Sequence, residues 1–121
     1  PEPLDASCFA ALGKMSARLA QEGRELMVVS TPLHPQWKEK YDPDGTFLAD
    51  FDKQIMETLN ATGGTYWNAD KDWNTPVSSF VDAVHLRWSV VQGFTAALAE
   101  QMRDAAIAPA PSSTLETAKL P

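Results

Sequence analysis

The chain has 121 residues, of which 44% are hydrophobic and 21% are charged, an ordinary composition for one globular domain. Its net charge is -6, and its ten lysine and arginine residues are scattered along the sequence. A nucleic-acid partner is therefore excluded, because no basic patch could attract phosphates. No apolar run approaches the roughly 18 residues that a membrane-spanning helix needs.

The first predicted element is a helix from Leu4 to Gly23. Asp5 or Ser7 can cap its amino terminus and glycine ends it, while apolar residues recur at helical spacing at Phe9, Leu12, Met15 and Leu19. The helix carries the only cysteine, Cys8, which can form no internal disulfide. We expect Cys8 to be buried as a small apolar residue.

A short apolar run from Leu26 to Thr31, ended by a proline, predicts a parallel strand covered on both faces. The following segment, Pro32 to Gly45, contains three prolines and the turn sequence Asp-Pro-Asp-Gly, and it is predicted to be a loop. Asp42, Asp44 and Gly45 match only part of a calcium loop, so a turn with a helix cap is expected there. Loops at the carboxyl ends of parallel strands commonly carry ligands.

A second helix is predicted from Thr46 to Ala61, because apolar residues stand four apart at Phe47, Phe51, Ile55 and Leu59. Gly63-Gly64 is expected to end it. A second, weaker strand covers Thr65 to Asn68, and a polar loop covers Ala69 to Ser79. The third helix runs from Trp88 to Ala106. The remaining segment, 108–121, is rich in Pro, Ser, Thr and Ala and is predicted to be a flexible tail.

The order helix, strand, helix, strand, helix is typical of an α/β domain with a parallel sheet. Two parallel strands alone leave most strand edges unpaired, so we expect further strands from elsewhere. Residues 1–107 are accordingly predicted to be half of an α/β domain. The other half would come from a preceding segment or a second polypeptide.

Asp82 and His85 stand three residues apart just before the third predicted helix. A carboxylate beside an imidazole fixes its tautomer and stabilises the imidazolium, as a general base requires. The competing interpretation is a capping pair, in which Asp82 binds the amino terminus of a helix without any chemistry.

The run Asp82-Ala83-Val84-His85-Leu86, followed by Gly93 eight residues after the histidine, resembles the last block of the SGNH (GDSL-type) esterases and acyltransferases. The segment Val28 to Trp37 is more loosely similar to the carboxyl-terminal part of the D-alanyl transfer protein of teichoic-acid modification and to polysaccharide O-acyltransferases. Only the part from Asp82 to Gly93 is specific, because an Asp-x-x-His arises often by chance.

The resemblance implies that residues 1–107 are the carboxyl-terminal half of a three-layer α/β/α, SGNH-like (flavodoxin-like) domain. In this domain His85 is the general base and Asp82 orients it. The family's nucleophilic serine lies in a Gly-Asp-Ser block that this sequence lacks. Ser7 and Ser16 fall on the first helix, and the neighbours of Ser30 do not match that block. The chain alone is therefore expected to be inactive and to need the amino-terminal half of the same domain.

Three further residues are candidate substrate contacts. His34 stands between two prolines on the loop after the first strand, and Trp37 follows it within the segment of looser resemblance. Trp73 stands next to acidic residues on the second loop, where its ring could stack on a sugar. Each of these residues could equally serve in packing or lie on the surface.

The resemblance implies an esterase or O-acyltransferase acting on cell-envelope or polysaccharide esters, with an acyl donor and a polysaccharide or small ester as partners. It implies an extracytoplasmic location, membrane attachment only through a segment outside this sequence, and no metal or organic cofactor. The alternative is a non-catalytic α/β binding or assembly module, in which His85 would be buried and hydrogen-bonded away from any cleft.

Overall fold

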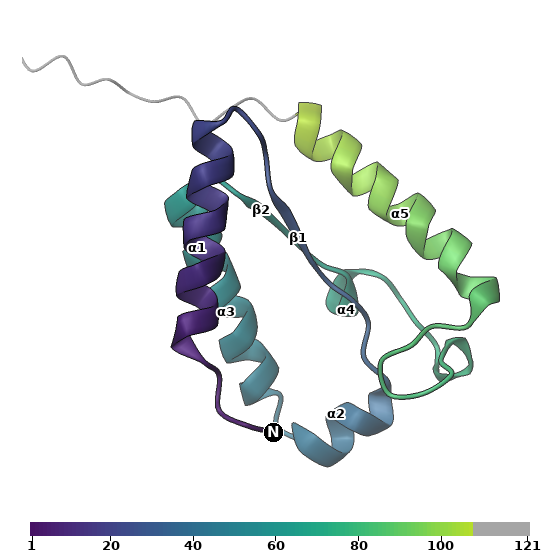
Figure 1. The fold of residues 1–121 in the computed structure, drawn as a ribbon. Coiled ribbons are helices and arrows are strands. Elements are labelled where there is room, and N and C mark those ends of the chain that lie inside the picture. Colours follow the sequence, from purple (N-terminus) through teal and green to yellow (C-terminus); the bar gives the residue numbers. More distant parts are fainter. Residues whose placement is uncertain (108–121) are drawn as a thin grey trace, which may run out of the picture.

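The computed structural model describes residues 1–107, a mixed α/β arrangement of five helices and a two-stranded parallel sheet. The sheet lies between two helices on one side and a single long helix on the other (Figure 1). The predicted order of helix, strand, helix, strand, helix is confirmed, with two short helices added. The predicted tail at 108–121 lies outside the described residues.

Helices α1 (Ala6–Gln21) and α3 (Thr46–Thr62) pack side by side on one side of the sheet (Figure 1). Asp5 caps α1 by accepting a hydrogen bond from the Ser7 N–H at 2.8 Å. The rings of Phe9 and Phe51 meet edge to face between the two helices, with centroids 6.0 Å apart. Gly63 adopts a left-handed conformation, φ 83°, and ends α3 as the sequence predicted.

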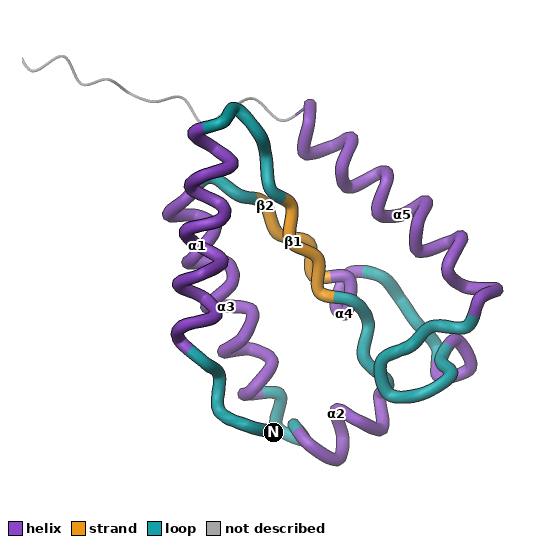
Figure 2. Tube along the Cα trace, in the orientation of Figure 1, coloured by secondary structure: helices purple, strands orange, loops and turns teal. Residues whose placement is uncertain are grey.

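The two strands, β1 (Met27–Ser30) and β2 (Thr65–Asn68), pair in parallel with Met27 opposite Thr65 and Ser30 opposite Asn68 (Figure 2). The parallel pairing is confirmed. All four residues of β1 are only half-buried, so the expectation that both faces of this strand are covered is wrong for the described residues. The apolar side chains lack cover because the sheet contains only one neighbouring strand.

Helix α5 (Trp88–Ile107) covers the opposite side of the sheet (Figure 1). Its Phe94 ring stacks on Trp67 of β2, with ring centroids 5.7 Å apart, and meets Trp73 edge-on, with centroids 5.3 Å apart. Trp67 is 5% exposed, and its indole N–H has no acceptor among residues 1–107. Trp88, at the start of α5, is 83% exposed. This side of the sheet is therefore packed less completely than the side that α1 and α3 cover.

Two predicted loops contain helices. The segment 32–45 includes α2 (Pro35–Tyr41), because Pro35 occupies the first turn, where its missing N–H costs nothing, and His34 caps that turn. The segment 69–79 includes α4 (Ala69–Asp72), capped by the Asn68 side chain, and a 3-10 turn at Val77–Ser79. Short helices lack enough turns to show an apolar period, so the sequence pattern missed both.

The expectation for Cys8 is also wrong, because this cysteine is exposed and free. Helix α1 directs Ser16 and Phe9 toward α3 and leaves Cys8 on its outer surface. The buried apolar core consists instead of residues from α3, β2, α4 and the segment before α5: Ile55, Leu59, Trp67, Ala69 and Phe80.

Candidate active site

Asp82 and His85 lie in a compact loop between the 3-10 turn and α5. The loop is closed by an antiparallel bridge between Phe80 and Leu86, and the Val81 N–H donates to the His85 carbonyl at 2.8 Å. Inside the loop, Asp82 Oδ1 accepts hydrogen bonds from the backbone N–H groups of Val84, at 3.0 Å, and His85, at 2.9 Å. The turn therefore holds the Asp82 carboxylate in place.

The same carboxylate holds the imidazole of His85. His85 Nδ1 lies 2.9 Å from Asp82 Oδ1 and 2.8 Å from Oδ2. The backbone N–H of Val84, together with the side chain and N–H of His85, lowers the pKa of Asp82 from 3.8 to about 2. Because an ionised carboxylate can only accept, Nδ1 carries the proton, and Nε2 of the neutral ring is left as an acceptor.

Both side chains are accessible, since that of His85 is 72% exposed and that of Asp82 is 54% exposed. No hydrogen bond within residues 1–107 involves His85 Nε2. The capping interpretation holds only within the loop, because the two N–H groups that Asp82 binds precede α5, which begins at Trp88. The pair is thus a local carboxylate–imidazole unit with its outer nitrogen facing solvent.

The loop of Asp82 and His85 is attached to the segment that follows β1. The His34 N–H donates to the Ala83 carbonyl at 2.9 Å, and the His34 ring meets Phe80 edge-on at 5.2 Å. A shallow hollow of about 380 Å³ lies at this junction. Its lining combines the carboxylate with aromatic and basic side chains: His34, Gln36, Trp37, Lys40, Tyr41, Val81, Asp82 and Ala83.

Two of the three candidate substrate contacts therefore lie together beside Asp82. His34 and Trp37 both line the hollow, whereas Trp73 packs against Phe94 of α5 and does not line it. His34 also caps α2, accepting a hydrogen bond from the Gln36 N–H at 3.1 Å. Gly93, the last residue of the family-like block, lies on α5, where an added Cβ would meet only Trp73 at 3.8 Å.

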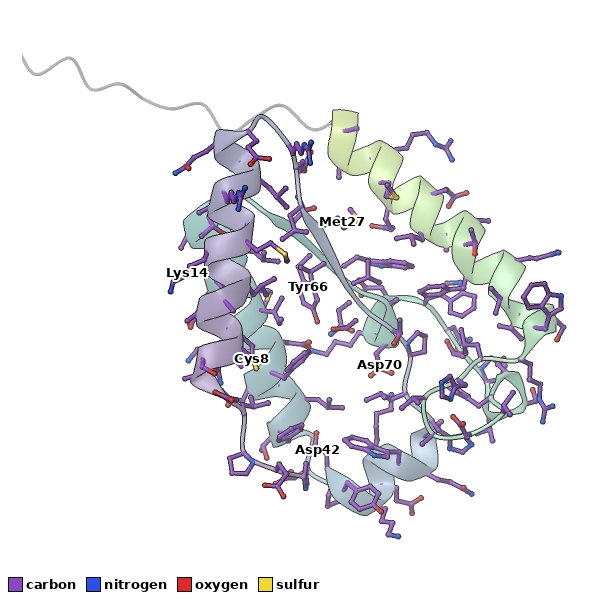
Figure 3. All side chains as sticks on the ribbon, viewed as in Figure 1. Cys8, Lys14, Met27, Asp42, Tyr66 and Asp70 are labelled. Carbon is purple, nitrogen blue, oxygen red and sulfur yellow. The ribbon has the colours of Figure 1, made fainter. Side chains whose placement is uncertain are left out.

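A second, larger cavity of about 650 Å³ lies at the carboxyl ends of the two strands. Asp52 of α3, 6% exposed, lies at its polar side. Asp52 accepts hydrogen bonds from Tyr66 Oη and Asn68 Nδ2, each at 2.6 Å, and pairs with Lys71 Nζ at 2.7 Å. Tyr66 lies between the strands and α3 (Figure 3).

The Asp52 cluster is internally satisfied. Burial, followed by the hydrogen bond to Asp52, raises the pKa of Tyr66 to about 12, so this phenol stays protonated. Since Tyr66 donates its only proton to Asp52, Ser30 Oγ, at 2.7 Å, must donate to Tyr66. A signal existed in the sequence, because Asp52 stands three and seven residues before the buried Ile55 and Leu59, which places a carboxylate on the apolar face of α3.

The residues around this cavity include a second ion pair. Lys38 of α2 lies 2.9 Å from Asp70 Oδ1, and the Leu33 N–H donates to the same oxygen at 2.8 Å. Both charged pairs therefore tie elements together across the carboxyl end of the sheet. In residues 1–107, no group of three or more His, Cys, Asp or Glu side chains is placed to hold a metal ion.

No serine hydroxyl hydrogen-bonds to His85 within residues 1–107. Ser7 serves the α1 cap, Ser16 is 2% exposed, and Ser30 donates to Tyr66 in the larger cavity. None of these three serines completes a triad with Asp82 and His85. No helix in the described part of the chain is long and apolar enough to cross a membrane.

No family model matches the chain, and neither the curated proteins nor the solved structures include a detectable relative.

Proposed function

We propose that this chain supplies the histidine and aspartate of a serine-dependent acyl-transfer site, as the carboxyl-terminal part of a three-layer SGNH-type domain. The observation that carries the proposal is the Asp82–His85 unit, in which two backbone N–H groups fix a carboxylate that holds Nδ1 at 2.8 Å. The exposed outer nitrogen is what a general base needs in order to reach a hydroxyl.

In the proposed reaction, a serine from the remaining part of the domain attacks an ester or thioester carbonyl. His85 Nε2 takes the serine proton, and the Asp82 carboxylate stabilises the imidazolium that forms. The imidazolium then protonates the leaving alcohol or thiol as its bond to the acyl carbon breaks, which leaves an acyl-serine. His85 next removes a proton from the acceptor, water in an esterase or a polymer hydroxyl in a transferase, as the acceptor attacks the acyl carbon. The imidazolium returns this proton to the serine oxygen when the bond between serine and the acyl group breaks.

The hollow beside Asp82 supports an acceptor that carries a ring. Trp37 and Tyr41 line the hollow with ring centroids 5.5 Å apart, and Lys40 Nζ lies 5.0 Å from the centroid of the Tyr41 ring. Aromatic faces pack against sugar rings, whose axial C–H groups are apolar. A polysaccharide hydroxyl is therefore the proposed acceptor, and an extracytoplasmic location follows from that substrate class.

Labelling with a serine-directed phosphonate tests this function in the complete natural polypeptide that carries the chain. We expect covalent labelling of one serine outside residues 1–107, and we expect His85→Ala to abolish both labelling and ester turnover. Asp44→Asn is the matched control, because Asp44 is likewise an exposed carboxylate bonded to a backbone N–H, that of Thr46 at 3.3 Å. Undiminished labelling of the His85→Ala protein would reject the catalytic role.

A further inference from the structure

Strand β1 pairs with β2 along one edge, and its other edge is open within residues 1–107. The Thr65 N–H of β2 donates to the Leu26 carbonyl at 2.8 Å. This bond determines which residues of β1 direct their backbone groups toward β2. In a parallel pair, alternate residues direct both backbone groups to the same neighbour. With Met27 opposite Thr65, the N–H and C=O groups of Val28 and Ser30 face β2, and those of Met27 and Val29 face away from it.

The outward groups of β1 have no partner in the described part of the chain. No hydrogen bond within residues 1–107 reaches the N–H of Met27 or Val29 from outside the sheet, and both side chains are only half-buried. An apolar strand with an unpaired edge is a template for another strand. The sheet is therefore prepared to continue beyond β1.

The helices show which side the added strand takes and in which direction it runs. Helix α3 links β1 to β2, and α1, which lies on the same side of the sheet, leads into β1 (Figure 1). Crossovers between parallel strands are right-handed in about 98% of cases. Two successive crossovers on one side must step across the sheet in one direction, so the strand before α1 lies on the edge of β1 opposite β2.

The direction of α1 agrees with such a crossover. This helix begins near the end of the sheet where β1 leads into α2, and it returns to the start of β1 (Figure 1). A preceding strand that ends where α1 begins runs parallel to β1. A second copy of the chain placed across a two-fold axis would instead pair β1 with β1 in antiparallel fashion, which the crossover geometry does not favour.

We propose that β1 is an inner strand, and that a parallel apolar strand from the part of the same domain that leads into α1 pairs with Met27 and Val29. The loop that holds Asp82 and His85 is bonded to the segment after β1 through the His34 N–H and the Ala83 carbonyl. The strand pairing itself does not depend on the proposed function. Only the expectation that the added part carries the nucleophilic serine rests on it.

Amide hydrogen exchange in the complete natural polypeptide tests the proposal. We expect the outward amides of Met27 and Val29 to exchange within about tenfold of the rates of Val28 and Ser30, which pair with β2. Exchange of Met27 and Val29 at least about a hundredfold faster than Val28 would overturn it, because an exposed edge offers no protection. Protection of the Met27 and Val29 amides that disappears when the protein is diluted would also overturn the proposal. It would show that β1 pairs with a second copy of the chain.

A second measurement does not depend on exchange rates. Nuclear Overhauser contacts from the Val29 N–H to residues outside 1–107 are expected in the sequential pattern of a parallel neighbour, and an antiparallel pattern would contradict the proposal. The two proposals also fail separately. A paired β1 edge without phosphonate labelling rejects only the acyl-transfer function, whereas labelling of a protein with an open β1 edge rejects only the inner-strand assignment.

Discussion

Two carboxylates in this molecule are surrounded by hydrogen-bond donors, and they differ in every other respect. Asp52 lies on α3, is 6% exposed, and gathers donors from Tyr66, Asn68 and Lys71. Asp82 lies in a surface loop, and its donors are the two N–H groups of its own turn and the ring of His85. Asp52 joins parts of the chain that are distant in sequence, whereas Asp82 organises only six or so residues around itself.

The difference in exposure bears on the role of each carboxylate. All partners of Asp52 are protein groups at 2.6–2.7 Å, so the carboxylate is enclosed by its own fold and serves to fix α3 against the sheet. Asp82 instead makes its shortest contact, 2.8 Å, with an imidazole that remains 72% exposed. An enclosed carboxylate fits a structural role, and an oriented but accessible base fits the proposed chemistry.

The largest expected effect is on activity. In the complete polypeptide, Asp82→Asn should lower the rate of acyl transfer by about 10²- to 10⁴-fold, because an amide neither fixes the Nδ1–H tautomer nor stabilises the imidazolium. The urea midpoint of unfolding should fall only slightly, since the side chain is 54% exposed and solvent screens its contacts. Steady-state kinetics and urea titration measure the two effects, with Asp44→Asn as the control. A matching loss of stability would assign Asp82 to the architecture.

The second effect is on folding. Asp52→Ala should lower the free energy of unfolding by about 3 kcal/mol, because it leaves the partly buried Tyr66 and Asn68 groups and the Lys71 ammonium without their acceptor. Urea denaturation of the complete natural polypeptide provides the measurement. Asp50→Ala is the control on the same helix, because Asp50 is exposed and bonded only to Gln54. An equal loss of unfolding free energy in both variants would show that the contacts of Asp52 stabilise the fold no more than an exposed carboxylate does.

A smaller effect contrasts the two sides of the molecule at glycines. A Cβ on Gly64 would lie 2.7 Å from Leu59 Cδ2 and 3.0 Å from Ser16 Oγ, so Gly64→Ala should cost about 1–3 kcal/mol of overpacking. On α5, a Cβ at Gly93 meets only Trp73 at 3.8 Å. Gly93→Ala should therefore raise the free energy of unfolding by about 0.5–1 kcal/mol. Thermal melts of both variants test the contrast, and a destabilising Gly93→Ala would indicate a close approach by residues outside 1–107.

The smallest effect concerns titration. The Asp82 carboxyl should titrate with a pKa of about 2, measured by carbon NMR of the side chain. Because its folded pKa lies below the usual 3.8, its stabilising contribution is complete above about pH 4 and is lost as the pH falls through 2.

Replacing His85 by alanine should raise the pKa of Asp82 without restoring 3.8, since the N–H of Val84, the largest cause of the shift, remains. Asp44, whose pKa is lowered by Thr46, should not respond. An Asp82 pKa that is unmoved by His85→Ala would contradict the hydrogen bond to the ring.

The helices with long apolar periods were predicted to within two or three residues, because spacing, capping and terminal glycines act within a few residues of one another. α1 starts after Asp5 and α3 ends at Gly63, as expected. The short α2 and α4 were missed, since each depends on a capping side chain, that of His34 or Asn68, instead of a repeated pattern. Cys8 was misplaced because the face that α1 buries is chosen by α3, not by α1 itself.

The Asp82–His85 contact follows from local sequence, because three residues and one tight turn are enough to bring the carboxylate to the ring. The order of strands and helices likewise follows from local periodicity and glycine stops. The tertiary fold, in contrast, places His34 and Trp37 beside Asp82 and Trp73 away from it, and it encloses Asp52 between Tyr66 and Asn68. Those neighbours come from different elements, and the pairing of β1 with β2 sets where each element lies.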